Sequence, residues 1–329
     1  MHPSTITTWI LTDGKAGMVN QCLGLAQALG VEPDVRTIAV RQPWLSLPPQ
    51  LWLSPFSALR TRSDRLAPPW PDLLIASGRI TVALSRAVRQ RSGGRTFTVQ
   101  IQNPAIPLQN FDLVVTPAHD RLHGPNVLST RGALGLVRPG RLQAEAERFR
   151  AGVADLPGPR IMVSLGGDNG AYRMTEAVID RLATDLRTMI TDEGGSLLIT
   201  PSRRTDETLA ARLRHAIADL PHRWYDGQGD NPYLGWLGLA DAVVVTGDSV
   251  NMVSEACATG KPVLVVQLEG GNAKFGRFHE AMTRDGLTRP FAGRLERWTY
   301  PPLDDTAMVA DHVRAGLQQR QRPGVAKGS

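Results

Sequence analysis

The sequence predicts an α/β protein with two doubly wound parallel sheets in two domains. Its 329 residues exceed the usual size of one domain, and a hydrophobic content of 42% is enough for two cores. Short apolar runs alternate with helical patterns, which is typical of parallel sheets. Three of the apolar runs end in glycine-containing turns, as strands do where a ligand-binding turn leads into a helix.

Each half of the chain contains five apolar runs that we expect to form strands. The strands expected are 7–12, 34–40, 71–77, 96–102 and 111–117 in the first half, and 160–167, 195–202, 222–226, 241–247 and 261–267 in the second. The helices expected are 18–29, 80–91, 173–190, 205–219, 249–258 and 276–284. Pro and Gly follow a charged helix at 154–160, which favours a boundary there. We therefore expect domains at 1–156 and 157–302, with a helix at 303–320 packing back on the first domain.

The basic residues are concentrated in the first half. Residues 1–150 hold 17 Lys and Arg against 9 Asp and Glu, whereas residues 151–329 hold 20 against 22. A basic surface attracts nucleic acid, anionic lipid or a phosphorylated substrate, or it only confers solubility. No nucleic-acid-binding motif is present, so no nucleic acid partner is expected.

The cysteines and the apolar runs indicate a cytoplasmic location. Cys22 and Cys257 lie far apart, without CxxC or Cys/His spacing, so neither a disulfide framework nor a structural zinc site is expected. No run approaches the ~18 to 20 apolar residues that span a bilayer, and the N-terminus lacks the pattern of a signal peptide.

Three glycine-rich turns are candidates for phosphate binding. They are TDGKAG (12–17), LGGDNG (165–170) and TGDS (246–249), each after an expected strand. Glycine lets the backbone approach a phosphate, and the following helix offers free N–H groups and the positive end of its dipole. Neither GxGxxG nor GxxxxGK[ST] occurs in these turns, which disfavours the usual dinucleotide fold and P-loop NTPases. Glycine in such turns also occurs for geometry alone.

An acidic residue lies inside the helix that follows the third turn. On a helix that begins near Ser249, Glu255 falls on the face that carries Asn251 and Met252. Its carboxylate could accept hydrogen bonds from both hydroxyls of a ribose, while the turns approach a diphosphate. The alternatives are a solvated glutamate, and an N-cap pair formed by Asp248 and Ser249.

Five segments carry a resemblance to a known family. TDGKAGMVNQ, PDLLIASGR, HD followed by GPNVL, LGGDNGAYRM and TGDSVNMVSEA resemble the ELM-type mitochondrial fission family over nearly the whole chain. That family is similar to GT-B glycosyltransferases, which implies two Rossmann-like domains that face a cleft, with a nucleotide sugar on the C-terminal one.

The resemblance implies roles for the nucleotide-binding residues. Glu255 would bind the ribose, Gly166, Gly167 and Ser249 the diphosphate, and Ser202 with Arg203 would clamp the nucleotide. The nucleotide-sugar ligands expected are Gly166, Gly167, Asn169, Ser202, Arg203, Gly247, Asp248, Ser249, Asn251 and Glu255. GT-B enzymes generally need no bound metal, and no HExxH or DxD motif argues otherwise, so neither metal nor cofactor is expected.

The first domain is expected to supply the catalytic base and the acceptor site. The peptidoglycan glycosyltransferase of the GT-B superfamily has a histidine in its first glycine turn, whereas this chain has none there. The candidate bases are therefore Asp13 and the pair His119 and Asp120, which end expected strands. The residues expected to bind acceptor or phosphate are Gly14, Lys15, Gly17, Asn20, Gln21, Arg79, Gln102 and Asn103.

The segment 41–65 combines apolar residues with arginines. Its apolar residues lie between 44 and 56, and Arg60, Arg62 and Arg65 follow. This composition suits peripheral contact with the anionic inner face of a membrane, and equally suits a Pro-rich loop that packs on the domain.

These observations together favour a GT-B glycosyltransferase. We expect an inverting, metal-independent enzyme that transfers a sugar from a nucleotide-diphosphate sugar to an envelope or lipid-linked acceptor. The alternatives are a non-catalytic adaptor with the same fold and a non-hydrolysing nucleotide-sugar epimerase.

Overall fold

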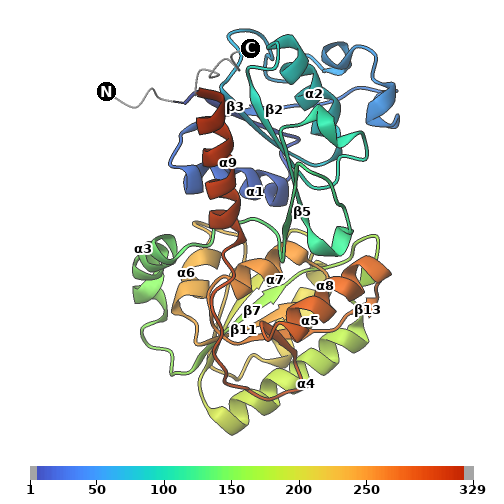
Figure 1. The fold of residues 1–329 in the computed structure, drawn as a ribbon. Helices are drawn as coiled ribbons and strands as arrows, with labels where there is room; N and C mark the ends of the chain where they lie inside the picture. The colour runs from blue at the N-terminus through green and yellow to red at the C-terminus, as the bar shows by residue number, and fades with distance from the viewer. Residues whose placement is uncertain (1–5, 322–329) are drawn as a thin grey trace. The chain divides into compact units, whose positions relative to one another are not determined.

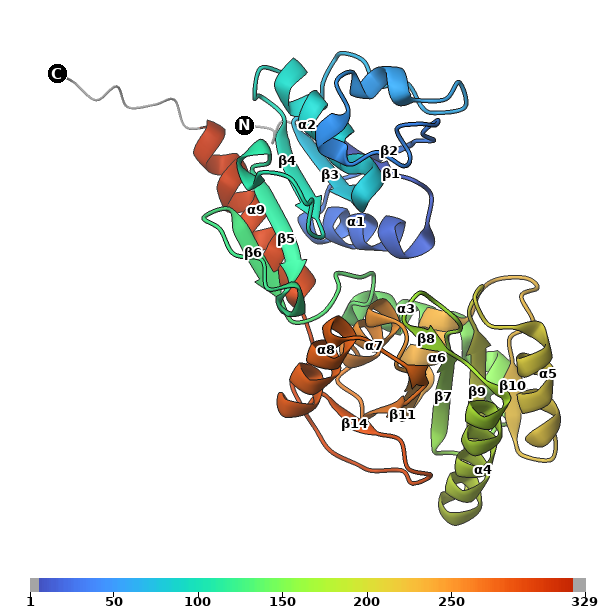
Figure 2. The same cartoon turned by 90° about the vertical axis from the view of Figure 1, so that its right-hand side faces the viewer.

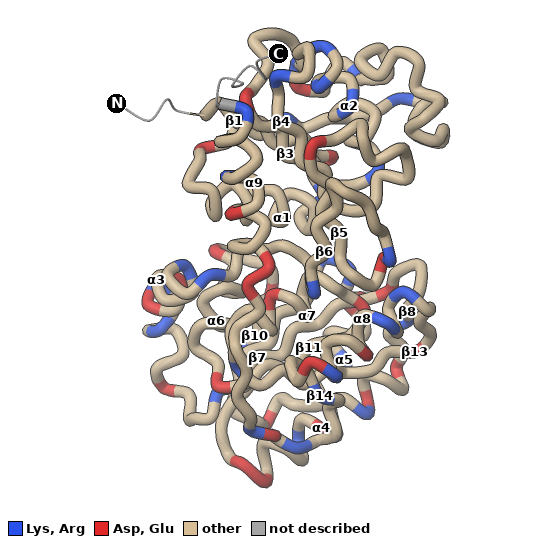
Figure 3. The backbone as a smooth tube through the Cα atoms, in the orientation of Figure 1, with Lys and Arg blue, Asp and Glu red and all other residues tan. Residues whose placement is uncertain are grey.

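The chain forms two compact units in a computed structural model that describes residues 6–321 (Figure 1). Unit 1 comprises the residues up to Leu136 together with those from Asp304 onward, and unit 2 comprises Val137–Leu303. The chain therefore leaves unit 1, builds unit 2 and returns. Unit 1 carries 17 Lys and Arg against 10 Asp and Glu, and unit 2 carries 20 against 21. The excess of basic residues thus belongs to unit 1, while both signs lie interspersed over unit 2 (Figure 3).

Unit 1 is built on a six-stranded, wholly parallel sheet in the order β2-β1-β3-β4-β5-β6. Its strands are β1 (Thr8–Thr12), β2 (Pro33–Thr37), β3 (Leu73–Ser77), β4 (Phe97–Ile101), β5 (Leu113–Pro117) and β6 (Val127–Thr130). Its helices are α1 (Ala16–Leu29), α2 (Val82–Arg91) and α9 (Asp305–Gln321). Short 3-10 turns span Pro49–Leu51, Pro55–Ala58, Arg79–Thr81, Leu108–Asn110 and Ala118–Asp120.

Both faces of this sheet are covered, because side chains alternate along each strand. Ile10 of β1 faces a cluster that includes α1 and residues Val309 and Val313 of α9. Its neighbour Leu11 faces the opposite cluster, with α2 and Trp52 from the loop after β2. The helix α9 lies against α1 (Figure 1). The last described helix therefore completes the core of the unit in which the chain begins.

Unit 2 repeats this plan with the order β10-β9-β7-β11-β12-β14, again parallel. Its strands are β7 (Arg160–Leu165), β9 (Ser196–Pro201), β10 (His222–Trp224), β11 (Ala242–Thr246), β12 (Val263–Val266) and β14 (Thr288–Pro290), and β8 (Tyr172–Arg173) pairs antiparallel with β13 (Glu269–Gly270). Its helices are α3 (Pro139–Arg150), α4 (Glu176–Glu193), α5 (Glu207–Ala216), α6 (Tyr233–Leu239), α7 (Val250–Cys257) and α8 (Ala273–Arg284), with a 3-10 turn at Ala151–Val153. Figure 2 shows α4 and α5 beside β9 and β10.

The boundary expected at 154–160 lies inside unit 2, because α3 packs against α6. A Cβ added at Gly235 would lie 2.8 Å from the carbonyl oxygen of Glu145, and one at Gly238 would lie 2.7 Å from that of Leu142. The two glycines of α6 therefore let the helix backbones approach closely. This contact makes α3 part of unit 2, so the boundary between the two units lies between Leu136 and Val137.

All the apolar runs expected to form strands do so, and the elements that the sequence does not predict are short. The parallel, doubly wound fold is confirmed, and β6, β8, β13, β14 and α6 are the elements that the sequence reading did not contain. Among the described residues, every helix is too short or too polar to cross a lipid bilayer.

Candidate functional site

The carboxyl ends of β7 and β11 form the point in unit 2 where the strand order reverses. From β7 the chain proceeds outward to β9 and β10, then returns to place β11 on the other side of β7. Ligands of doubly wound sheets bind at such a reversal, beyond the carboxyl ends of the strands. The Gly166–Gly167 turn follows β7, and the Gly247–Asp248 turn follows β11, so two of the predicted turns meet at this point.

An ion pair between a fully buried carboxylate and a guanidinium on a side chain that is 39% exposed holds these turns together. The side chain of Asp248 has no exposed surface, and its Oδ2 lies 2.6 Å from Nη2 of Arg204. The same oxygen accepts a hydrogen bond of 3.2 Å from the N–H of Gly167. Nη1 of Arg204 donates to the carbonyl oxygen of Gly167 at 2.8 Å. Arg204 follows β9, so a single guanidinium ties together the turns after three strands.

Glycine is required in the first turn because other groups occupy the space of a side chain. A Cβ on Gly166 would lie 2.1 Å from Oδ1 of Asp248, and one on Gly167 would lie 2.0 Å from the carbonyl oxygen of Arg204. Real Cβ atoms never approach other atoms so closely. These glycines therefore have a packing role, which is independent of any phosphate that approaches the turn from outside.

Several residues expected to bind ligand also build the scaffold. The side-chain Nδ2 of Asn169 donates to the carbonyl oxygen of Asp248 at 2.9 Å, and its Oδ1 accepts from the N–H groups of Ala171 and Tyr172. Ser202 accepts a hydrogen bond from the N–H of Arg204. Both side chains therefore shape turns. Arg203 is exposed, and the ion pair in this turn belongs to its neighbour Arg204.

The N-terminus of α7 opens at the same point. Ser249 is its N-cap and accepts a hydrogen bond of 3.3 Å from the N–H of Met252, which leaves its own hydroxyl hydrogen to donate. The cap interpretation of Ser249 is thus correct. Asn251 is half-buried in the first turn of this helix.

Glu255 lies farther along α7, half-buried and fixed by a tyrosine. Its Oε2 accepts a hydrogen bond of 2.8 Å from the hydroxyl of Tyr233, and Ser164 of β7 lies near enough to that hydroxyl to lower the pKa of Tyr233. Burial raises the pKa of Glu255 to about 7, although the tyrosine bond acts in the opposite direction. Since Ser164 lies two residues before Gly166, the Tyr233 hydroxyl and the carboxylate that it bonds lie on the side of β7 that leads to the glycine turn. Glu255 is not a freely solvated glutamate.

In unit 1 the corresponding turn is held by local contacts. Oδ2 of Asp13 lies 2.9 Å from Nζ of Lys15, whose side chain is 72% exposed, and Oδ1 accepts the N–H of Lys15. The N–H of Gly14, which has φ +82°, donates to the hydroxyl of Thr12 at 3.1 Å. In α1, Gly17 and Asn20 are half-buried and Gln21 is buried.

His119 and Asp120 lie together directly after β5. Nε2 of His119 is 3.5 Å from Oδ1 of Asp120, and Oδ2 of Asp120 accepts a hydrogen bond of 3.1 Å from Thr116. Both side chains are at least nine-tenths buried. The neighbouring carboxylate can therefore orient the imidazole, as a general base requires.

Other residues expected at the acceptor site have structural partners. The guanidinium of Arg79 donates to the carbonyl oxygens of Leu45 and Leu47 at 3.0 and 2.9 Å, so it secures the loop after β2. Asn103 accepts the N–H of Ala105 and closes a turn. Gln102 has φ +74°, and its amide nitrogen lies 3.2 Å from the sulfur of Met18.

Comparison with known proteins identifies the family. The family model described as mitochondrial fission ELM1 matches residues 16–317. The chain belongs to the mitochondrial fission ELM1 family. It is 33% identical to the mitochondrial fission protein ELM1 of Arabidopsis thaliana over 76% of this chain and 65% of that protein, so it spans less than two thirds of that relative. An uncharacterised protein of Rickettsia prowazekii is 24% identical over 94% of this chain and 98% of its own length.

Solved structures show the fold of this ELM1-family chain. UDP-GlcNAc 2-epimerase from Methanocaldococcus jannaschii, in complex with UDP-GlcNAc and UDP, matches with a TM-score of 0.54 and 11% identity, covering 94% of this chain and 98% of that one. The UDP-GlcNAc 2-epimerase of Neisseria meningitidis, bound to UDP-GlcNAc, matches with a TM-score of 0.51 and 11% identity, covering 94% of this chain and 100% of that one. At these identities the likeness concerns the fold alone. The GT-B-like fold and the family expected from the sequence are confirmed.

Three residues of the candidate site are not predicted from the sequence. Arg204 directly follows Arg203, the arginine that the resemblance implies as a nucleotide ligand, and only the turn after β9 determines that Arg204 pairs with Asp248. Tyr233 lies in a segment without a recognisable motif. His279 of α8 bonds the carbonyl oxygen of Gly247 at 2.7 Å, and burial lowers its pKa. Within residues 6–321, no three His, Cys, Asp or Glu side chains gather as metal ligands would.

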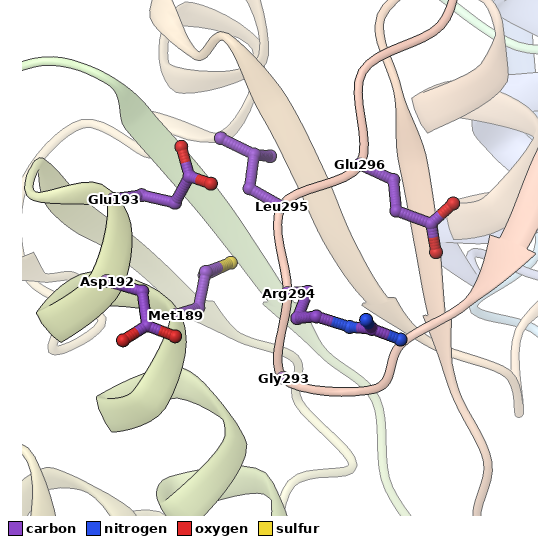
Figure 4. A pocket seen from close by; sticks show the side chains of 7 residues that line it. All are labelled: Met189, Asp192, Glu193, Gly293, Arg294, Leu295 and Glu296. Carbon is purple, nitrogen blue, oxygen red and sulfur yellow. The ribbon is translucent and has the colours of Figure 1, made fainter.

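A hollow of about 470 Å³ lies elsewhere in unit 2 (Figure 4). It is lined by Met189, Asp192, Glu193, Gly293, Arg294, Leu295 and Glu296. Glu193 pairs with Arg297 at 2.7 Å and Glu296 with Arg289 at 2.5 Å. The hollow adjoins the C-terminal end of α4, immediately before β9 begins, and so lies at the amino edge of the sheet. Ligands of such sheets bind at the opposite edge.

Proposed function

We propose that unit 2 binds a nucleotide-diphosphate sugar and that the protein transfers the sugar to an acceptor. The observation that carries this proposal is the Glu255 carboxylate, fixed by Tyr233 on α7, the helix that follows the Gly247–Asp248 turn at the strand-order reversal. A carboxylate suits the two hydroxyls of a ribose, and the turn with the start of α7 suits a diphosphate. Epimerases with this fold are described in complex with UDP-GlcNAc and UDP, which makes these compounds the first probes.

Substitution of Glu255 tests the nucleotide site. UDP and UDP-GlcNAc should raise the melting temperature of the wild type, and Glu255→Gln should weaken UDP binding by roughly tenfold or more, since a hydrogen bond to a charged group is worth about 1.5 to 3 kcal/mol. The control is Glu280→Gln, because Glu280 is exposed on α8. Equal UDP affinity in the wild type and Glu255→Gln would remove Glu255 from the site.

The candidate bases are tested by kinetics. Asp13→Asn and His119→Gln should leave UDP binding unchanged and lower transfer by roughly 10², the usual scale for a lost general base. A variant that loses UDP binding would show that its residue serves the nucleotide instead. Incubation with UDP-GlcNAc alone separates the alternatives: an epimer product indicates an epimerase, while neither reaction in the presence of envelope acceptors indicates an adaptor.

The acceptor proposal rests on the loop after β2. Trp52 is 2% exposed, and Phe56 stacks on Trp70 at 6.1 Å, so the packing interpretation holds for these aromatic residues. Leu51 and Leu53, in contrast, are 56% and 96% exposed. We infer that these two leucines, with the arginines that follow, contact an anionic membrane surface that carries a lipid-linked acceptor. Each buried leucine contributes about 2 kcal/mol and each nearby arginine about 1 kcal/mol.

Vesicle binding tests this contact. The wild type should co-sediment with phosphatidylserine vesicles at low salt and less with phosphatidylcholine vesicles, and the Leu51→Ser/Leu53→Ser variant should remain in the supernatant. The control is Val35→Ser/Met308→Ser, which removes exposed apolar side chains elsewhere in unit 1. A wild type that ignores both kinds of vesicle would make a soluble acceptor the better candidate.

A further inference from the structure

The helix α6 is too short to be stable alone, yet its position is fixed at three places. An isolated helix of seven residues does not form in water, so tertiary contacts must hold it. Before its start, the side chain of Asn231 accepts the N–H of Tyr233 at 2.9 Å. In its middle, Gly235 and Gly238 lie directly on the backbone of α3.

At the C-terminal end, Lys261 holds two of the orphan carbonyls of α6. Its Nζ donates to the carbonyl oxygens of Leu237 and Gly238, both at 2.7 Å. A cation at this position also complements the negative end of the helix dipole. Burial lowers the pKa of Lys261 to about 8. This pKa is still above neutral pH, so the charged ammonium form predominates there. Tyr233 therefore belongs to a helix whose position is fixed by its contacts at both ends and in its middle.

The position of Tyr233 decides how Glu255 can receive a ligand. The tyrosine hydroxyl occupies one lone pair of Oε2, and within residues 6–321 no other group donates to this carboxylate. Oε1 is left to accept. A carboxylate free to rotate would lose rotamer freedom on binding, whereas one held by a neighbour has lost it already. The tyrosine itself is held by α6, which Asn231 and Lys261 secure at its two ends.

We propose that Tyr233 is a positioning residue that presents the Glu255 carboxylate to the two hydroxyls of a ribose. This inference rests on the proposed nucleotide site and adds to it the residue that makes Glu255 selective for a diol. The bond from Tyr233 also favours the ionised carboxylate, which accepts from both hydroxyls. The titratable group that bonds Glu255 is Tyr233 of α6. Ser164 of β7 lies near the Tyr233 hydroxyl and stays neutral over the pH range in which Glu255 titrates.

The test compares UDP with 2′-deoxy-UDP in the wild type and in Tyr233→Phe. A site built to bond a hydroxyl rejects the analogue that lacks it. The wild type should therefore prefer UDP by roughly tenfold or more, and Tyr233→Phe should reduce this preference to about two- or threefold. The control is Tyr300→Phe, which also removes one buried hydroxyl of unit 2, here bonded to the carbonyl of Lys261. Tyr300→Phe should keep the preference even if it lowers the melting temperature.

A second readout does not need ligand. The carboxyl ¹³C signal of Glu255, assigned by its loss in Glu255→Gln, should titrate at a higher pH in Tyr233→Phe than in the wild type, because the tyrosine bond lowers the pKa of Glu255. An unchanged midpoint overturns the inference, as does a Tyr233→Phe variant that retains the full preference for UDP while the proposed nucleotide site stands. A wild type that binds no UDP overturns both proposals.

Discussion

The two units present the same local plan at the carboxyl edge of their sheets and secure it differently. In unit 1 the first glycine turn is held by Thr12 and by an Asp13–Lys15 pair whose lysine is largely exposed. In unit 2 the equivalent turn is held by the Asp248–Arg204 pair, whose carboxylate is fully buried and which joins three strand ends. Pairs of exposed charges contribute little to stability, whereas removing the partner of a buried carboxylate is costly. The unit 2 edge is therefore the preformed one, which suits the proposed nucleotide site, and the unit 1 edge can adapt.

The largest expected effect comes from removing the cation beside the buried Asp248 carboxylate. Arg204→Met should destabilise the protein by about 3 kcal/mol, because it leaves the Asp248 carboxylate buried without a cation. Arg203→Met, one residue away and exposed, should change stability by less than about 0.5 kcal/mol. Urea unfolding followed by circular dichroism measures both. Similar midpoints for the two variants would contradict the difference between the two edges.

A slightly smaller effect is expected from filling the turn itself. Gly167→Ala should cost about 2 to 3 kcal/mol, since the added Cβ would lie 2.0 Å from a backbone carbonyl oxygen and the turn must move. Gly170→Ala, in the same loop but with no atom within 4 Å of its Cβ, is the matched control and should be nearly neutral. Thermal melts of the pair suffice. If both substitutions proved neutral, the turn would be looser than its contacts indicate.

Glu255 should cost stability in a pH-dependent manner. Below pH 4.5 the carboxyl of Glu255 is protonated in both the folded and the unfolded chain. Between pH 4.5 and about 7 it ionises only in the unfolded chain, so the free energy of unfolding falls as the pH rises. Above pH 7 it is ionised in both states, and the loss of stability is constant. Glu255→Gln does not titrate. It should therefore match the wild type at pH 4 and exceed it by on the order of 2 kcal/mol at pH 8. Parallel stability profiles of the two proteins would show that the carboxylate is not desolvated.

The smallest effect is expected in the unit 1 turn. Gly14→Ala should cost about 1 kcal/mol, because φ is +82° while the nearest atom to the new Cβ is 3.8 Å away. Only backbone strain opposes this substitution, in contrast to Gly167→Ala. The comparison of their melting temperatures should give the smaller shift for Gly14→Ala. The reverse order would mean that the unit 1 turn is the more constrained one.

The fold was predictable from sequence because the strands are continuous apolar runs buried on both faces. The additional helix α6 was not, since YLGWLGL contains two glycines that disfavour a helix, and only the contact with α3 makes them useful. The three-residue β14 likewise depends on its pairing with β12.

The candidate site divides in the same way. The glycine turns and Glu255 follow from strand ends and helix periodicity, which are local. The choice between Arg203 and Arg204, and the bond from Tyr233 across 22 positions of sequence, depend on how three or four elements meet. The sequence indicates which edge of the sheet carries the site, and the contacts show which side chains build it.

The return of the chain to unit 1 has a consequence for biosynthesis. Val309, Ala310 and Val313 of α9 are fully buried in the unit 1 core beside Phe97 and Cys22. A ribosome that has released residues up to 303 has therefore delivered all of unit 2, whereas unit 1 still exposes the apolar surface that α9 will cover. Although β1 is synthesised before any strand of unit 2, unit 1 can finish folding only after unit 2 has been synthesised.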